Sequence, residues 1–440
     1  MSRISAADRL AVDLEAAGAE MYGLVRAWYP IPRSLTGAGI REQFRQMGAL
    51  IPLTVTAVPT GTPLFDWKAP REWNVREAYI LTPDGRRIGD FHDFNLHLLA
   101  YSTPVRAKMP LAALKEHLFT LPDHPTWVPY RTSYYKEQWA FCLSQEVVDA
   151  LPEGEYEVVI DTTLEDGALH YAECLLPGET EETVLFSAHA CHPSLANDNL
   201  SGLALATWLA RWLQQVPHRY TYRFVFAPGT VGAIAWLAQH ADETQQVRHG
   251  LVLSLLGDPH QQTYKRSRRG NALVDHAAAY VLQQAGKPHE VLDFIPYGYD
   301  ERQYCSPGFN LPMGCLMRAR PGLFPEYHTS ADNLDLVRPE CLADSLDTVL
   351  RILEVLEGEA TYENLSPYCE PQLGRRGLYG AVGGNIRTRE MALLWVLNQS
   401  DGYRSLFEIA QRSGCDFAEL RAAADALLEV DLLREVEPRA

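Results

Sequence analysis

The sequence has 440 residues, of which 47% are hydrophobic and 22% are charged, the balance of an ordinary globular protein. A chain of this length is expected to form two or three folding units rather than one core. Its formal net charge of −17 argues against a nucleic-acid or anionic-membrane partner, because both repel an acidic surface.

No apolar run approaches the roughly 20 residues that a membrane helix needs. The start of the chain has no apolar stretch of the kind found in signal peptides, so we expect no export. The eight cysteines are scattered and form no Cys-x-x-Cys pair, which predicts neither a thiolate zinc site nor a disulfide framework. These features favour a cytoplasmic protein with reduced thiols and no membrane partner.

The first 165 residues hold two different patterns. Apolar residues at helix-like intervals indicate helices before residue 50. After it, short apolar runs such as residues 78–81 end at turn signals such as Pro83-Asp84-Gly85, and many aromatic residues lie between prolines. We predict a small β-rich domain over residues 56–165, inserted in the chain as a lid or an oligomerisation module.

From about residue 166, strand-like runs alternate with helix-like segments, which indicates an α/β sheet with helices on both faces. The run at residues 183–188 is almost unbroken in its apolar character, as expected for a buried central strand. We predict that residues 1–55 and 166–365 form one catalytic domain. Further strands are expected over 222–227, 251–256 and 313–317, and helices over 200–213, 233–240, 272–285 and 342–357.

The C-terminal part has another character. Residues 360–385 are rich in glycine and proline and are predicted to be a linker. Residues 386–440 are predicted to form a winged helix-turn-helix domain, with three helical stretches before a strand-like end. Residues 388–440 hold 10 acidic residues and 6 arginines, a poor footprint for DNA phosphates. We therefore expect a packing or oligomer-forming module, and a homo-oligomer without nucleic acid.

The segment that follows the predicted central strand carries the richest chemistry. His189, His192 and Asp198 lie between the end of this strand and a helix, and ligands in open α/β sheets bind at the carboxyl ends of strands. Imidazole and carboxylate are the ligands of a catalytic zinc ion, which keeps one position for water and lowers its pKa to about 7. The alternative is structural: hydrogen-bonded histidines, with Asp198 as a helix N-cap.

A second segment strengthens this interpretation. His189, Asp198-Asn199-Leu200-Ser201-Gly202 and the downstream Tyr327-His328-Thr329-Ser330-Ala331-Asp332 resemble the zinc aminopeptidases of the M28 type. In those enzymes the corresponding histidines and aspartate bind metal. The resemblance therefore implies that His189, Asp198 and His328 are metal ligands in this chain.

A closer resemblance covers nearly the whole chain. It is to a bacterial aminopeptidase-like family related to the M28 peptidases, whose members carry a small inserted domain and a C-terminal winged helix. It implies a phosphorylase/hydrolase-like mixed sheet of the zinc aminopeptidase type, and members are often associated with surface-polysaccharide or secondary-metabolite pathways. The motifs that carry it are Trp-Asn-Val at 73–75, Phe-His-Asp-Phe-Asn-Leu-His at 91–97, Tyr-Arg-Thr-Ser-Tyr-Tyr at 130–135, Cys-His-Pro-Ser-Leu-Ala-Asn-Asp-Asn at 191–199 and Tyr-Lys-Arg-Ser-Arg-Arg-Gly at 264–270.

The sequence departs from the M28 pattern at three positions. Residues 227–232 hold no carboxylate where the M28 enzymes have a Glu-Glu pair. Ser254 stands near the place of an aspartate ligand, with Asp258 just beyond it, and Cys191 replaces an orienting aspartate. We therefore expect one zinc ion rather than two.

The choice between the two early histidines stays open at this point. Alignment of the strand favours His189, whereas the Cys-His-Pro pattern of the closer family keeps His192 as a candidate. Both could bind the metal, or one could be a hydrogen-bond donor behind the ligands.

A general base has to come from another segment. Asp300 and Glu301 precede a predicted strand, at a place where the M28 enzymes also contribute to the site. We hypothesise that Glu301 is the general base or a further ligand, and that Asp300 orients a neighbour. The alternative is an Asp-Glu-Arg turn at the surface. The basic segment at residues 264–269 is either an anion clamp for the substrate or a solvated loop.

Together these features predict a zinc-dependent hydrolase of amide or peptide bonds that acts on a peptide or an amide-containing small molecule. One alternative is a relative that catalyses a different acyl or amide reaction on a pathway intermediate. The other is a catalytically inactive binding or assembly protein, which the missing Glu-Glu pair favours.

Overall fold

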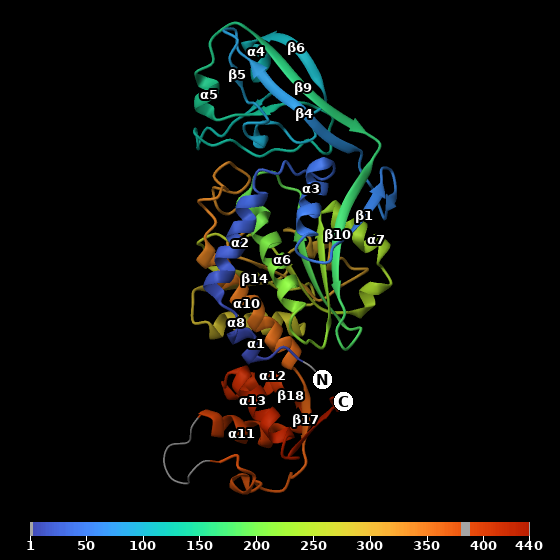
Figure 1. Cartoon of the computed structure of the whole chain (residues 1–440), viewed down its shortest axis with the longest axis vertical. Helices are drawn as coiled ribbons and strands as arrows, with labels where there is room; N and C mark the ends of the chain where they lie inside the picture. Colours follow the sequence, from blue (N-terminus) through green and yellow to red (C-terminus); the bar gives the residue numbers. More distant parts are fainter. Residues whose placement is uncertain (1–2, 380–387, 440) are drawn as a thin grey trace.

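The computed structural model describes residues 3–379 and 388–439, and these form three parts stacked along the long axis of the molecule (Figure 1). A sheet covered by helices occupies the middle, a β-rich part lies at one end and a small helical part lies at the other. No helix in the described ranges is both long and apolar enough to cross a membrane.

The middle part is built on a mixed sheet of eight strands. The four central strands, β12, β11, β13 and β16, are parallel, while β10 and β1 are antiparallel at one edge. At the other edge, β14 is antiparallel to β16 and parallel to β15. In spatial order the strands are β1 (Thr54–Pro59), β10 (Ala168–Leu176), β12 (Thr221–Ala227), β11 (Thr183–His189), β13 (Val247–Leu253), β16 (Met313–Met317), β14 (Gln262–Lys265) and β15 (His289–Leu292).

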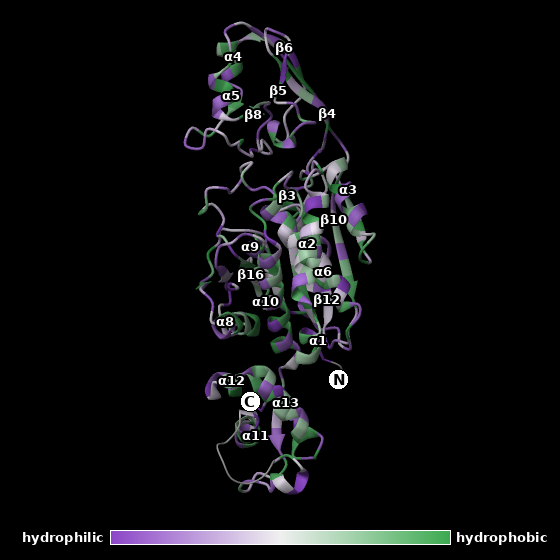
Figure 2. Ribbon diagram, turned by 60° about the vertical axis from the view of Figure 1, so that its left-hand side comes forward, coloured by the Kyte–Doolittle hydropathy of each residue, from purple (hydrophilic) through white to green (hydrophobic). Residues whose placement is uncertain are grey.

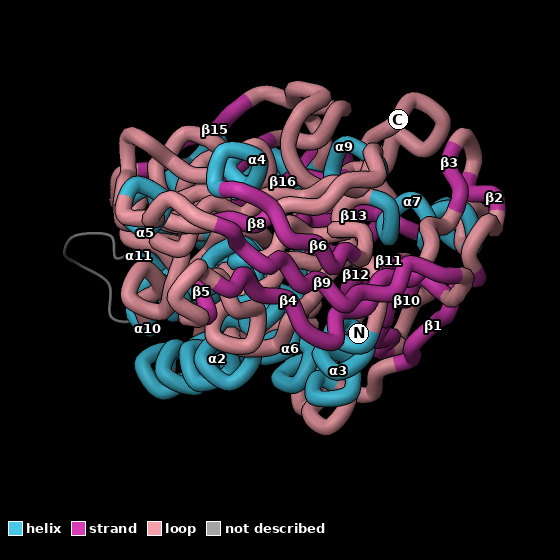
Figure 3. The backbone as a smooth tube through the Cα atoms, turned by 90° about the horizontal axis from the view of Figure 1, so that it is seen from above, coloured by secondary structure: helices cyan, strands magenta, loops and turns pink. Residues whose placement is uncertain are grey.

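Helices cover both faces of this sheet, as predicted. Successive residues of a strand point to opposite faces, so Val184 and Phe186 pack into one hydrophobic core while Leu185 packs into another. Seen from above, α2, α3 and α6 lie on one side of the strands and α7 and α9 on the other (Figure 3). The first face is covered by α2 (Leu14–Trp28), α3 (Ala38–Met47), α6 (Gly202–Leu213), α8 (Leu273–Gln284) and α10 (Pro339–Gly358), and the second by α7 (Val231–Gln239) and α9 (Glu301–Tyr304); α1 (Ala6–Leu10) contacts α10.

Hydrophobic residues are concentrated where the strands and α6 meet (Figure 2). Every residue of β11 is buried, which explains why its sequence is almost unbroken in apolar character. This strand ends at His189, which therefore lies at the carboxyl edge of the parallel strands.

The β-rich part is a separate antiparallel sheet in the order β5-β4-β9-β6. The long strand β9 leads directly into β10 of the main sheet, so the two sheets are joined by a short turn. β1 lies across the predicted boundary at residues 55/56, and the division into domains stays a prediction. The elements are β4 (Glu72–Leu81), β5 (Arg87–Ile88), η1 (Asn95–His97), β6 (Val105–Pro110), α4 (Leu111–Lys115), β7 (Leu118–Phe119), β8 (Phe141–Cys142), α5 (Gln145–Asp149) and β9 (Glu155–Glu165), with a hairpin of β2 (Pro63–Leu64) and β3 (Trp67–Lys68) between β1 and β4.

The described residues of the C-terminal part form three α-helices, one short 3-10 helix and a three-stranded sheet in the order β18-β17-β19. The prediction of a linker over residues 360–385 is wrong for its start, because β17 directly follows α10 and pairs with β19 at the end of the chain. The predicted domain start at 386–387 lies outside the described residues. The elements are β17 (Thr361–Asn364), η4 (Leu373–Arg376), α11 (Thr388–Gln399), β18 (Asp401–Ser405), α12 (Leu406–Ser413), α13 (Phe417–Leu428) and β19 (Leu433–Val436).

Candidate metal centre

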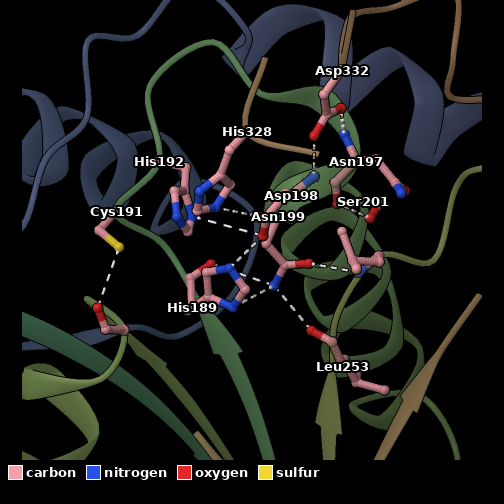
Figure 4. A network of polar contacts seen from close by, with 12 residues as sticks. His189, Cys191, His192, Asn197, Asp198, Asn199, Ser201, Leu253, His328 and Asp332 are labelled. Carbon is pink, nitrogen blue, oxygen red and sulfur yellow. Dashed lines mark hydrogen bonds and ion pairs between the residues drawn. The ribbon is translucent and has the colours of Figure 1, made fainter. Parts of the chain in front are cut away.

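Three imidazoles converge on the carboxylate of Asp198 (Figure 4). Nε2 of His189 lies 2.7 Å from Oδ1 of Asp198, and Nε2 of His328 lies 3.0 Å from Oδ2. Nδ1 of His192 lies 3.7 Å from Oδ1 of the same carboxylate. The ligand atoms of His189, His192 and Asp198 all lie within 4.8 Å of one another. The structure therefore brings together all four residues predicted to bind metal.

Local backbone geometry explains how these residues meet. His189 is the last residue of β11, and Asp198 lies in an irregular turn before α6, with non-helical dihedrals of φ −103° and ψ 86°. His328 has a left-handed backbone with φ 56°, a conformation that is uncommon outside glycine. Its carbonyl accepts a hydrogen bond of 2.8 Å from the backbone N–H of Tyr130, so the β-rich part fixes this loop.

Asp332 holds the turn that carries Asp198. Its carboxylate accepts hydrogen bonds from the backbone N–H groups of Asn197 at 2.5 Å and Asp198 at 2.9 Å. Burial, with the nearby charge of Asp198, raises the pKa of Asp332 to about 8. Asp258 takes a similar supporting place, because it accepts hydrogen bonds from Asn197 Nδ2 at 2.8 Å and pairs with His260 Nδ1 at 2.7 Å.

The electrostatics of the centre suit a cation. Burial lowers the pKa of His192 to about 3, so its imidazole is neutral, and its buried Nδ1 has no hydrogen-bond partner among the described residues. Although burial acts in the opposite direction, the nearby imidazoles of His192, His189 and His328 hold the pKa of Asp198 well below its usual range. Imidazoles around an ionised carboxylate form the donor set that zinc prefers, so the residues present fit this metal.

Tyrosines enclose the imidazoles. The ring of Tyr299 stacks on His189 with centroids 4.6 Å apart, and the ring of Tyr327 stacks on His328 at 3.9 Å. Tyr130, from the β-rich part, presents its ring at 5.3 Å from His192 and 5.2 Å from His328. Tyr299 is not among the residues predicted for the site, although its position directly before Asp300 is a signal that points to it.

Asp300 and Glu301, the two carboxylates predicted to serve the reaction, have different surroundings. Asp300 is 1% exposed, and neither of its carboxylate oxygens has a hydrogen-bond partner among the described residues. A Cβ atom on Gly229 would lie 3.1 Å from Cβ of His189 and 3.4 Å from Oδ1 of Asp300, which places Asp300 beside His189. Burial raises the pKa of Asp300 to about 6.

Glu301 points instead to the predicted basic segment. It forms a buried ion pair with Lys265, whose Nζ also donates a hydrogen bond of 2.8 Å to the carbonyl of Tyr297. Arg268 and Arg269 of the same segment donate to the side chain and the carbonyl of Asn310. One cation of this segment is thus used inside the fold, under the loop that carries Asp300.

Comparison with known proteins supports the predicted relationship. Residues 22–359 match the model of a family described as a domain of unknown function (DUF4910), and residues 360–435 match a winged helix-turn-helix family. A protein from Clostridium acetobutylicum, provisionally named a polysaccharide biosynthesis protein with an aminopeptidase-like domain, is 46% identical over 421 residues, which are 95% of this chain and 97% of that protein.

Solved structures agree with this result. A crystal structure of a provisionally assigned peptidase from Clostridium acetobutylicum is 45% identical and covers 96% of this chain and 98% of its own, with a TM-score of 0.93. A zinc aminopeptidase from Bacillus subtilis is 15% identical and covers 77% of this chain and 94% of its own, with a TM-score of 0.57. An M28 peptidase precursor from Shewanella amazonensis, also 15% identical, covers 80% and 96%, with a TM-score of 0.56. The predicted fold, a mixed α/β sheet like that of zinc aminopeptidases with a C-terminal winged helix, is confirmed.

Proposed function

The chain belongs to the family described as a domain of unknown function (DUF4910), and we propose that it is a zinc-dependent hydrolase of amide bonds. The observation that carries the proposal is the convergence of His189, His192 and His328 on the buried carboxylate of Asp198. Three imidazoles around one carboxylate, closed off by aromatic rings, form a site built for a cation rather than a packed core.

We propose that a single zinc ion is held by His189, Asp198 and His328, which leaves the fourth position of a tetrahedral ion for water. His192 lies beside these ligands, next to the carboxylate of Asp198. When bound, zinc supplies Lewis acidity toward a carbonyl oxygen and increases the acidity of water. The turn fixed by Asp332 keeps the carboxylate of Asp198 aimed at the histidines. A second ion lacks support, because residues 227–232 contain no carboxylate and Asp258 is engaged by Asn197 and His260.

Of the two predicted carboxylates, Asp300 is the better candidate for the general base. It lies beside His189, it is buried without a hydrogen-bond partner, and its pKa of about 6 is close to the pH at which a base works best. Asp300 would accept a proton from water and pass it to the leaving amine. Glu301, in its ion pair with Lys265, would hold the loop that positions Asp300.

For the substrate we propose a peptide or an amide-containing small molecule, taken from a biosynthetic pathway. The name of the 46% identical relative refers to polysaccharide biosynthesis, which favours an amide attached to a sugar or to its precursor. The rings of Tyr130, Tyr299 and Tyr327 would shield the reacting amide from bulk water.

Metal analysis and a substrate panel test the proposal together. Protein purified without added metal should contain close to one zinc per chain, and it should release free amine from members of a panel of aminoacyl amides and N-acylated amino sugars. His328→Ala should lose both the metal and the activity, whereas His92→Ala, which removes an exposed imidazole of the β-rich part, should keep both. Wild-type protein without bound metal would favour the inactive binding protein instead.

A further inference from the structure

A cleft of about 520 Å³ lies between the inserted β-rich part and the β2–β3 hairpin. Residues 66–71, which include β3, line one side, and residues 133–137 line the other. Tyr101 is buried in the floor, where its hydroxyl lies 2.7 Å from Oγ1 of Thr36. Clefts between two folding units are common places for ligands, so this one is a candidate binding site.

Aromatic side chains from both sides meet in the cleft. The ring of Trp67 lies 6.2 Å from that of Tyr135, which in turn lies 4.8 Å from the ring of Tyr134. Tyr134 continues the series to Tyr101, with centroids 5.8 Å apart. Tyr135 nevertheless remains 83% exposed, so its ring is open to solvent at the wall of the cleft. Its face is available to a ligand.

Charged side chains share the cleft with these rings. Arg71 on one side forms an ion pair with Glu137 on the other, which ties the two walls together. Lys68, Lys136 and Asp66 are exposed along the same walls. The cleft thus offers three cations and two carboxylates in a chain whose net charge is −17.

This combination selects one chemical class of ligand. An apolar peptide side chain prefers a pocket lined mainly by apolar groups. A sugar ring has an apolar face of C–H groups, which the electron-rich face of an aromatic ring attracts, and an edge of hydroxyls. The hydroxyls, and any acidic substituent of the sugar, match the lysines, the arginine and the carboxylates.

One loop connects the cleft with the candidate metal centre. Residues 128–137 form one loop, whose beginning is bound to the loop of His328 by hydrogen bonds from Val128 N to Ser330 Oγ at 2.9 Å and from Tyr130 N to His328 O at 2.8 Å. Tyr134 follows Tyr130 by four residues, which is at most about 14 Å of extended chain. One substrate of moderate size can therefore reach both places.

We propose that this cleft binds a saccharide ring, as the remote part of the substrate whose amide is placed at the metal centre. The second half of this statement rests on the proposed hydrolase function, whereas the binding of a saccharide does not. The contact with Trp67 and Tyr135 fixes the ring, and the loop of residues 128–137 sets its distance from the imidazoles.

Saturation-transfer NMR on the full chain as purified tests the proposal. The probes are glucose, N-acetylglucosamine, glucuronate and glucose 1-phosphate. We expect transfer to the ring protons of at least one of them. Tyr135→Ala, and separately Trp67→Ala, should raise its Kd by about 10-fold. The matched control Tyr368→Ala, which removes a 91% exposed ring from the C-terminal part, should leave the Kd unchanged.

Two results would overturn the proposal. One is no transfer to any of the four probes, or a Kd that neither substitution changes. The other is tighter binding of N-acetyl-phenylalaninamide with the same dependence on Tyr135, which would make the cleft a peptide subsite. Saccharide binding that depends on Tyr135, in a protein that hydrolyses no amide of the panel, would support the cleft and count against the hydrolase.

Discussion

Nε2 of His328 lies 3.0 Å from Oδ2 of Asp198, although 130 residues separate them in the sequence. This contact joins the loop before α10 to the turn before α6, and His189 closes the group from the end of β11. An ion held here would bind three segments of the main part at once, so metal binding is expected to couple to the stability of the fold.

Loss of the hydrogen bonds that hold the turn of Asp198 should weaken the binding of the metal. In Asp332→Asn, one end of the side chain becomes an NH₂ group, which cannot accept the backbone N–H of Asn197 or Asp198. We expect the affinity for zinc to fall by about 10- to 100-fold. Competition with a fluorescent chelator measures it, with the exposed neighbour change Asp335→Asn as the control. An unchanged affinity for zinc would show that Asp332 does not support the metal centre.

Asp300→Asn tests the proposed base. The amide keeps the size of the side chain but cannot take up a proton, so kcat should fall by about 100-fold or more while the zinc content stays the same. The control is Asp293→Asn, whose side chain is 98% exposed. Full turnover by Asp300→Asn would exclude this residue, and the same assay on Glu301→Gln would then decide whether the other carboxylate acts.

The ion pair between Lys265 and Glu301 should matter for stability. Both side chains are almost completely buried, so removal of one partner leaves a buried charge without its counterpart. Lys265→Met is expected to lower the free energy of unfolding by about 3 kcal/mol or more. The double variant Lys265→Met/Glu301→Leu should recover much of this loss in a urea titration. If the double variant is less stable than Lys265→Met, the charge of Glu301 has another partner.

The carboxyl group of Glu359 should make the free energy of unfolding depend on pH. Its carboxylate accepts the backbone N–H of Phe407 at 2.9 Å, and burial raises its pKa from 4.5 to about 7. Between these two pH values the folded chain keeps a proton that the unfolded chain has lost, so stability falls as the pH rises from 4.5 to about 7. The loss is complete above that range and amounts to at most about 3 kcal/mol.

Glu359→Gln removes this titration and keeps an acceptor for Phe407. Relative to the wild type, the variant should gain stability at pH 8 and show no gain at pH 4. Chemical unfolding at a series of pH values measures the difference. A gain that is equal at both pH values would show that Glu359 does not titrate in this window.

Much of the fold could be predicted from the sequence because its signals are local. The apolar run of β11 and the amphipathic helices depend on neighbouring residues, and the structure reproduces them with ends shifted by a few positions. The start of the supposed linker was missed because β17 is defined by a distant partner, with Thr361 paired to Val436. The cytoplasmic location, the homo-oligomer and the absence of a nucleic-acid partner stay predictions.

The candidate site likewise has residues that the sequence reveals and residues that only the structure reveals. His189, His192 and Asp198 stand close together in the sequence, so their pattern is visible without a structure. His328 was found only through the resemblance of its motif to a known family. The stacking of Tyr299 on His189 and the place of Tyr130 between His192 and His328 depend on loop conformations and on the packing of the inserted part, which no local pattern encodes.

Anomalous diffraction at the zinc absorption edge, from crystals of the full chain purified without chelator, tests the central claim most directly. We predict one anomalous peak at about 2.0–2.2 Å from the ring nitrogens of His189 and His328 and from a carboxylate oxygen of Asp198. The absence of a peak at this group, or a peak held by other side chains, would contradict a metal centre shared by these residues.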